Sequence, residues 1–342
     1  MTTAQSDSSA IDRSGPPCSR AGLAHLSLPS WVGAALHSTD GGLPRQSQQT
    51  IEGVMVSVQD AGTLALCSAT IKDTLGMSAA RLRSAVEHAY SAIFQAAENT
   101  AARHRVRMWS FIPDIHALCE HGLTTYHVFN QGRFNAFVRT LGSDLAFTGR
   151  LPTATGIGHD GSGLAIHCLN AHAPGVHIEN PRQVPAYRYS SAYGPRPPCF
   201  ARGTILTLPD RRLLLVGGTA SVRDEVSMHA DDIGSQLDET FENLCALALE
   251  AQPTADDKAG KFHLRRNGKP CALFSTTASV AKFTSLRVYF SDPSSEQMLR
   301  EDVRDRIGPG TEIELVAARL CREELLVEIE GVMELRTPAE GA

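Results

Sequence analysis

Two acidic residues near the C-terminus, Glu328 and Glu330, are spaced so that both could exchange protons with one bound molecule. Residues 325–332 alternate apolar and acidic side chains, and this period of two predicts a β-strand with Val327 and Ile329 on one side. The two glutamates then share the opposite side. An acidic strand face is most often simply solvent-facing. A carboxyl group removed from water instead has its pKa raised and can serve as a general acid near neutral pH.

Arginine and tyrosine residues are interleaved between positions 182 and 202, and this segment is suited to binding carboxylates. The planar guanidinium pairs with a carboxylate through two hydrogen bonds, and a tyrosine adds a donor beside an apolar ring. The segment therefore predicts a site for an anionic organic molecule; the alternative is a solvated proline-rich loop. Arg202 is the strongest candidate, because it begins a strand that should lie near the last one. The set comprises Arg182, Tyr187, Arg188, Tyr189, Tyr193, Arg196 and Arg202.

The glycine and histidine motifs elsewhere in the chain do not predict a cofactor site or a metal site. Gly218, in the run 216–219 (Val-Gly-Gly-Thr), would let strand backbone approach a ligand or a neighbour closely. The glycines at 156, 158, 161 and 163 predict a loop, since no strand-glycine-helix order of a dinucleotide site follows. The histidines at 159, 167, 172 and 177, with Cys168, fit neither a helical pair nor a zinc-finger spacing. We expect no metal and no cofactor.

Composition describes an ordinary globular chain. Its 342 residues suffice for two domains, and a net charge of -5 gives no indication of nucleic acid or an anionic membrane as a partner. The eight cysteines are scattered without a C-x-x-C pair, a pattern typical of reduced thiols. No apolar run approaches the roughly 18 residues of a membrane helix, and the N-terminus lacks the order of a signal peptide. These features predict a cytoplasmic protein.

The periodicity predicts an α+β fold made of two similar halves. Residues 1–50 lack sustained periodicity and are expected to be a flexible arm, followed by domains over 51–175 and 176–342. Each half is expected to run β-β-α-β-α-β, the last two strands of the chain forming a closing hairpin. The expected strands are 53–58, 63–71, 105–112, 163–170, 201–208, 212–220, 284–291, 312–318 and 325–332; the expected helices are 79–98, 124–141, 231–250 and 294–306, and 253–261 is an exposed linker.

The C-terminal half, about 198–334, resembles the YjgF/RidA family, whose fold is a chorismate-mutase-like barrel. In that family small ligands lie in trimer clefts faced by a carboxylate from the last strand. The imine deaminases of the family carry an arginine before the penultimate strand, whereas positions 309–312 here read Pro-Gly-Thr-Glu, which argues against imine hydrolysis. The resemblance is carried by the motifs Val216-Gly217-Gly218-Thr219-Ala220, Thr240-x-x-Asn243-Leu244, Leu286-x-Val288-Tyr289-x-x-Asp292-Pro293 and Val327-Glu328-Ile329-Glu330-Gly331.

Over roughly 50–335 the chain also resembles the chorismatases, which cleave chorismate to supply polyketide starter units or xanthomonadin-type pigments. Members resemble a YjgF trimer partly folded into one chain. The matching motifs are Trp109-x-x-Ile112-Pro113-x-Ile115, Tyr126-x-x-Phe129-Asn130-x-x-Arg133, Leu151-Pro152-x-Ala154-Thr155-Gly156-Ile157-Gly158, Glu179-Asn180-Pro181-Arg182-Gln183-x-x-Ala186-Tyr187-x-Tyr189 and Tyr193-Gly194-Pro195-x-x-Pro198-x-Phe200-x-Arg202.

This resemblance implies a cofactor-free enzyme, a monomer with a trimer-like internal arrangement, acting on chorismate to give pyruvate and 3-hydroxybenzoate, with 4-hydroxybenzoate as in the pigment pathway. Glu328 matches the proton donor of the family, with Glu330 as its rival, and Cys321 matches a cysteine of the members that aromatise the ring. A hydrolytic chorismatase giving a dihydroxycyclohexadiene carboxylate, an enamine or imine deaminase, and a non-catalytic binder of keto or aromatic acids remain alternatives. The expected substrate-binding residues are Arg202, Tyr193, Arg133, Tyr187 and Gly218.

Overall fold

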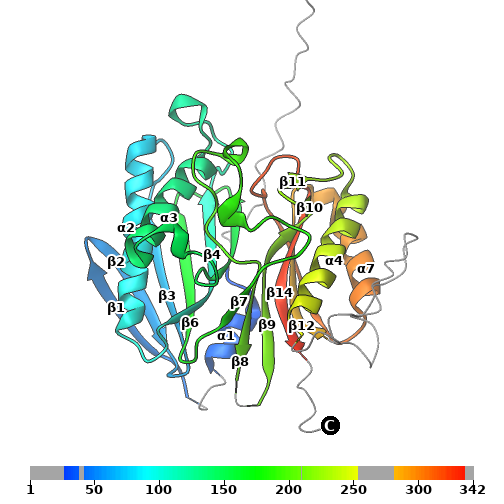
Figure 1. Cartoon of the computed structure of the whole chain (residues 1–342), viewed down its shortest axis with the longest axis horizontal. Helices are drawn as coiled ribbons and strands as arrows, with labels where there is room; N and C mark the ends of the chain where they lie inside the picture. Colours follow the sequence, from blue (N-terminus) through cyan, green and yellow to red (C-terminus); the bar gives the residue numbers. More distant parts are fainter. Residues whose placement is uncertain (1–26, 38–41, 209, 253–280, 336–342) are drawn as a thin grey trace, which may run out of the picture.

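The computed structural model describes residues 27–37, 42–208, 210–252 and 281–335. They form an α+β fold in which two mixed six-stranded sheets pack face to face, each covered on its outer side by helices (Figure 1). The expected linker 253–261 lies outside the described residues.

The first sheet has the strand order β1-β2-β3-β6-β4-β5, in which only β4 and β5 pair in parallel. Two helices cover its outer face, and their apolar stripes pack on the sheet through residues such as Val86, Phe94 and Phe137. The elements are β1 (Arg45–Ile51), β2 (Val54–Asp60), β3 (Leu64–Ile71), α2 (Ala79–Glu98), β4 (His104–Pro113), α3 (Thr125–Leu141), β5 (Thr153–His159) and β6 (Leu164–Ala171).

The second sheet has the order β13-β12-β14-β9-β8-β7, in which only β12 and β13 pair in parallel. Helices α4 and α7 cover it, and their apolar faces bury Phe241, Leu244 and Leu299 against the strands. The elements are β7 (Val176–Ile178), β8 (Gly203–Thr207), β9 (Arg212–Ala220), α4 (Ile233–Glu250), β12 (Ala281–Phe290), α7 (Glu296–Ile307), β13 (Glu312–Ala317) and β14 (Val327–Leu335), with a small separate pair formed by β10 (Val222–Arg223) and β11 (Val226–Ser227).

A third apolar core fills the space between the sheets. Trp109 and Phe111 of β4 meet Leu215 of β9 and Val332 of β14 there, and helix α1 (Ser30–His37) closes one end. The free edge of β5 is joined to the second half by bridges that pair Thr153 with Ala201 and Gly158 with Arg319. The sheets therefore share one interior, with β5 and β14 on its two sides.

Three sequence expectations are wrong in detail. Residues 1–50 are not all an arm, because α1 and β1 fall within them; β1 is an almost wholly polar edge strand, so no apolar alternation marks it. Gly156 and Gly158 lie in β5 rather than in a loop, and a Cβ on Gly158 would meet Ile115 Cγ2 at 2.5 Å. The closing hairpin does not form, since β12 lies between β13 and β14.

The main helices and most strands agree with the periodicity. The helices predicted over 79–98 and 124–141 match α2 and α3, and Ser78 and Thr124 cap them by accepting hydrogen bonds from Arg81 N and His127 N. No helix in the described part of the chain is both long and apolar enough to span a membrane.

Candidate active site

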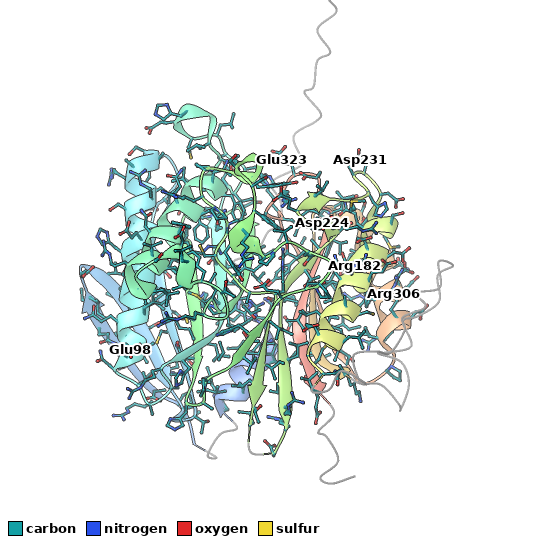
Figure 2. All side chains as sticks on the ribbon, in the orientation of Figure 1. Glu98, Arg182, Asp224, Asp231, Arg306 and Glu323 are labelled. Carbon is teal, nitrogen blue, oxygen red and sulfur yellow. The ribbon has the colours of Figure 1, made fainter. Side chains whose placement is uncertain are left out.

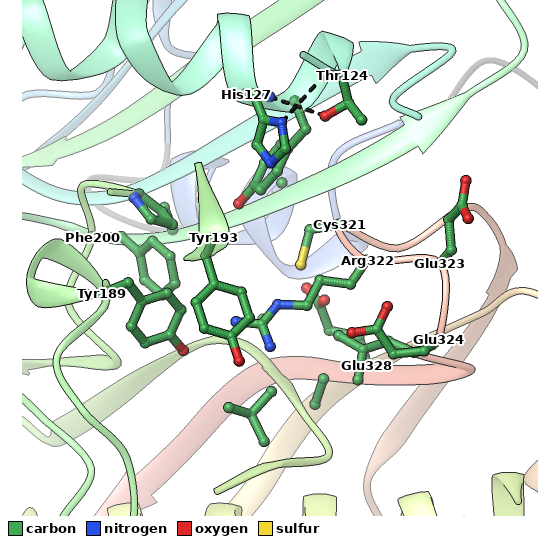
Figure 3. A pocket seen from close by; sticks show the side chains of 18 of the residues that line it. Thr124, His127, Tyr189, Tyr193, Phe200, Cys321, Arg322, Glu323, Glu324 and Glu328 are labelled. Atoms are coloured by element: carbon green, nitrogen blue, oxygen red, sulfur yellow. Dashed lines mark hydrogen bonds between the residues drawn. The ribbon is translucent and has the colours of Figure 1, made fainter. Parts of the chain in front are cut away.

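A cavity of about 330 Å³ opens where α3, β5, β9, the 183–202 segment and the start of β14 converge (Figure 3). Each of these elements carries a residue or motif that was singled out in the sequence, but only the packing of the two sheets brings them to one place. Among the predicted site residues, the cavity is lined by Arg133, Tyr193, Arg202, Gly218, Cys321 and Glu328.

Glu328 contributes a carboxyl group that is buried inside the cavity wall. Val327 and Ile329 pack into the core beneath α4 and α7, as predicted, so Glu328 faces the interior between the sheets and is only 4% exposed. Gly218 on the neighbouring strand leaves the necessary space, because a Cβ there would come within 1.9 Å of Glu328 Oε1. Within the described chain no group hydrogen-bonds this carboxyl. Burial, reinforced by the charge of Glu330 and opposed by Arg107 and Arg202, raises the pKa of Glu328 to about 8.

Glu330 lies on the same face of β14 but in a different environment. Its Oε2 accepts hydrogen bonds from Arg107, from Trp109 Nε1 at 3.0 Å and from Thr155 Oγ1 at 2.6 Å, and its Oε1 accepts one from the Tyr289 hydroxyl at 2.7 Å. Arginine and tryptophan can only donate, so Oε2 accepts from both, and the Arg107 guanidinium forms an ion pair with this carboxyl. Glu330 is not among the described side chains that line the cavity. Of the two glutamates, Glu328 is therefore the one that lines the cavity and, among the described residues, has no ion-pair partner.

Arg202 and Arg133 place two buried guanidinium groups at the cavity. Arg202 Nη2 donates to Tyr189 Oη at 2.7 Å and to the Val184 carbonyl, and Arg133 Nη2 donates to Asn130 Oδ1 at 2.6 Å. The Nε atom of each has no hydrogen-bond partner in the structure. Within the described residues neither guanidinium forms an ion pair with a carboxylate. Two buried cations with no described carboxylate within ion-pair distance are suited to an anionic ligand.

Tyrosine rings and Arg322 form another side of the cavity. The Arg322 guanidinium lies 3.9 Å from the Tyr193 ring centroid, and its Nη1 donates to the Glu225 carbonyl and to Ser227 Oγ (Figure 3). This stacking fixes the cavity-facing ring of Tyr193. Tyr187, expected to bind substrate, is not among the described lining residues; its ring packs edge-on against Phe147 in the first core.

Cys321 lines the cavity on the loop that enters β14, and Figure 3 shows its sulfur near Arg322 and Glu328. Burial, together with the charge of Glu328, raises the pKa of the thiol to about 12. The residue is thus a neutral thiol at physiological pH and not a nucleophilic thiolate.

Several lining or supporting residues were not predicted as site residues, although Tyr126 and Gln183 lie within the chorismatase-like motifs. Tyr126 and His127 of α3 and Gln183 line the cavity, while Arg107 of β4 lies behind Glu330. The signal for Arg107 was present, since this arginine stands between the apolar residues Val106 and Met108 of a predicted strand. The other arginines of the 182–202 segment serve the scaffold: Arg182, labelled in Figure 2, pairs with Glu239 of α4 at 2.6 Å, and Arg196 stacks on Phe134.

The histidines noted in the sequence do not converge. Their ring nitrogens bond separate partners: the Gly163 carbonyl for His159, Ser68 Oγ for His167, the Ala101 carbonyl for His172 and Thr204 Oγ1 for His177. Across the described ranges, no group of three or more potential ligand side chains is placed to hold a metal ion.

Comparison with known proteins gives consistent matches. A family profile described as "Chorismatase FkbO/Hyg5-like, N-terminal" matches residues 43–170. The chain is 36% identical over 262 residues to a 3-hydroxybenzoate synthase of Streptomyces hygroscopicus, covering 74% of this chain and 70% of that protein. It is 30% identical over 247 residues to a chorismatase of Streptomyces rapamycinicus, covering 71% and 68%. A crystal structure of a chorismatase superimposes with a TM-score of 0.67 at 26% identity, covering 84% of this chain and 79% of that one.

Proposed function

Because the chain belongs to the chorismatase family, we propose that it cleaves chorismate to pyruvate and 3-hydroxybenzoate. The observation that carries this proposal is the Glu328 carboxyl, which is buried in the cavity without a hydrogen bond from the described chain. Burial raises its pKa to about 8, which favours the protonated form at neutral pH. The relative named 3-hydroxybenzoate synthase supports the choice of product.

Glu328 acts as the general acid in the proposed reaction. Chorismate carries an enol ether, and transfer of the Glu328 proton to its terminal vinyl carbon produces an oxocarbenium ion. A hydroxyl of the substrate or a water then captures this cation, and pyruvate leaves. When the ring aromatises, pyruvate and 3-hydroxybenzoate together contain all the atoms of chorismate, so no net water is consumed. A pKa near 8 keeps the proton on Glu328 at pH 7 while leaving it acidic enough to transfer.

Arg202 and Arg133 hold the two carboxylates of chorismate in this proposal, and Tyr193 supplies an aromatic wall with a hydroxyl donor. Support comes from the buried guanidinium groups, which lack carboxylate partners among the described residues and each retain an unbonded Nε. Gly218 contributes space rather than a contact, because it admits the Glu328 carboxyl.

Cys321 steers the product. A neutral, partly buried thiol beside Glu328 occupies space that a water could otherwise fill, which favours capture by the substrate's own hydroxyl over hydrolysis. Formation of some 4-hydroxybenzoate belongs to the same proposal.

The architecture is proposed to be two YjgF/RidA-like halves. Equivalent strand orders support it: β2-β3-β6-β4-β5 in the first sheet corresponds to β8-β9-β14-β12-β13 in the second, with β1 and β7 added at the edges. Because residues of both halves line one cavity, a single chain supplies a complete site, which favours a monomer.

The test incubates purified, chelator-treated protein with chorismate and follows pyruvate and the aromatic acids by chromatography, for wild type and Glu328→Gln. We expect equal amounts of pyruvate and hydroxybenzoate from wild type, a rate that declines as the pH rises through about 8, and loss of turnover in the variant. Pyruvate with a non-aromatic diene acid would favour the hydrolytic alternative. Binding of chorismate without turnover would favour a non-catalytic binder. Turnover of an imine, but not of chorismate, would favour a deaminase.

A further inference from the structure

Glu330, two residues from Glu328 on β14, forms a buried pair with Arg107 of β4. Both side chains are 1% exposed, and Glu330 is saturated with hydrogen bonds from three other strands, β4, β5 and β12. A buried ion pair of this kind is costly to desolvate, so its presence is weak evidence of a stabilising role. Its position two residues from Glu328 on the same strand face indicates a role at the site.

The charged and titratable groups that face Glu328 come from several elements. Glu330 lies on the same strand, Arg107 on β4, Arg202 at the entry to β8, Tyr126 on α3 and Cys321 on the loop before β14. The residues of β9 beside Glu328, Gly218 and Ala220, cannot be ionised. Two of these groups are cations, and either cation alone would favour the carboxylate form of Glu328 over the protonated form.

We propose that Glu330 is a positioning residue for the proposed reaction, since its negative charge neutralises Arg107 and thereby lets Glu328 keep its proton. The inference rests on the proposed function. Without Glu330, Arg107 would face Glu328 as an uncompensated cation in a dry interior, and the proton would be lost to solvent at a lower pH. Glu328 would then already be deprotonated when chorismate binds and could not act as the general acid.

A hydrogen-bond relay also connects Glu330 to the space occupied by Glu328. Thr155 Oγ1 donates to Glu330 Oε2 at 2.6 Å and accepts from the backbone N–H of Gly218 at 3.0 Å. Gly218 is the residue whose missing side chain admits the Glu328 carboxyl. Glu330 therefore helps to fix the strand position against which the acid lies.

Glutamine at position 330 can preserve this geometry while removing the charge. Its carbonyl oxygen can accept from Arg107, Trp109 and Thr155, and its amide can donate to the Tyr289 oxygen, which also accepts hydrogen bonds. Glu330→Gln therefore removes the negative charge at position 330 while keeping the size and the hydrogen bonds of the side chain.

The test compares Glu330→Gln, Arg107→Met and the double variant with wild type in full-length protein. The alkaline limb of kcat with chorismate should move to lower pH by about one unit or more in Glu330→Gln, the size expected of one nearby interior charge, with a rate loss of about fivefold or more at pH 8. The double variant removes both charges and should return the limb towards its wild-type position. Arg107→Met should leave the limb in place or move it to higher pH. A Glu330→Gln limb that does not move, or a double variant whose limb stays low, overturns the proposal.

Infrared difference spectroscopy supplies a readout independent of turnover. The protonated carboxyl band of Glu328, identified by its absence in Glu328→Gln, is titrated in wild type and in Glu330→Gln. Equal midpoints overturn the inference whatever the activity. A lowered midpoint in a protein that does not turn over chorismate would sustain the charge relation and refute the proposed function.

Two controls separate the charge effect from general damage. Glu87→Gln removes a carboxylate bonded to Arg139 at 2.6 Å and to Asn135 on the outer helices, and it should leave both the limb and the infrared midpoint unchanged. If Glu330→Gln does not fold, Arg107→Met decides, because a midpoint lower than that of wild type in that variant contradicts the proposed role of the pair.

Discussion

Replacing Glu328 by glutamine is expected to stabilise the folded protein by an amount that increases with pH. In the folded state the Glu328 carboxyl has a pKa of about 8, against 4.5 for an ordinary glutamate, because it is buried beside Glu330. Between these two values the folded chain holds a proton that the unfolded chain has released. The free energy of unfolding therefore falls as the pH rises from about 4.5 to 8, and the loss is complete above the folded pKa.

The size of the effect follows from the shift. A pKa change of about 3.5 units corresponds to about 5 kcal/mol at most, and between pH 5 and pH 9 about 4 kcal/mol of it is expressed. Water entering the cavity relaxes part of this penalty, so we expect Glu328→Gln to gain about 2 to 4 kcal/mol over wild type across that range. Glutamine cannot ionise, and all other groups are shared by the two proteins.

The measurement is urea unfolding of both proteins at pH 5, 7 and 9, followed by circular dichroism and analysed with a common slope. The quantity of interest is the change with pH in the difference between the two unfolding free energies. A difference that stays constant from pH 5 to pH 9 would refute the assignment of a raised pKa to Glu328, and with it the view that stability is sacrificed for catalysis at this position.

Three further variants probe the other parts of the site. Gly218→Ala should lower kcat at least about 100-fold with a nearly unchanged urea midpoint, since its Cβ would lie 1.9 Å from Glu328 Oε1; near-normal turnover would contradict the placement of that carboxyl. Arg202→Lys should raise KM about tenfold, because an ammonium group cannot pair bidentately with a carboxylate, and an unchanged KM would exclude Arg202 from substrate binding. Cys321→Ala should keep total pyruvate release while shifting the ratio of 3-hydroxybenzoate to other products, and an unaltered ratio would remove Cys321 from product control.

The local pattern of apolar and polar residues was sufficient to predict most of the helices and strands. The stripe of α2, its cap at Ser78 and the alternation in β14 depend on neighbours within a few residues, so their spacing predicts them directly. Elements without such a pattern were missed or misplaced. Edge strand β1 is polar except for Ile51, and glycine-containing β5 is stabilised by pairing with β4, about 45 residues earlier in the chain.

Residue types and motifs likewise identified the arginines, Cys321 and the two glutamates as candidates, and the resemblance to chorismatases was confirmed by the comparisons. They could not show that Tyr187 packs into the first core, or that Arg322 joins Tyr193 at the cavity. Each of those facts depends on which surfaces the two sheets bring together.

The alternation of β14 by itself determined that Glu328 and Glu330 share one face, opposite Val327 and Ile329. It could not distinguish the two acids, because they have the same side chain and nearly the same neighbours along the chain. The tertiary structure made the distinction by surrounding Glu330 with donors from β4, β5 and β12, and Glu328 with the open space beside Gly218. Desolvation, charge and hydrogen bonding act through space, so the environment of each acid was decided by residues up to 223 positions away.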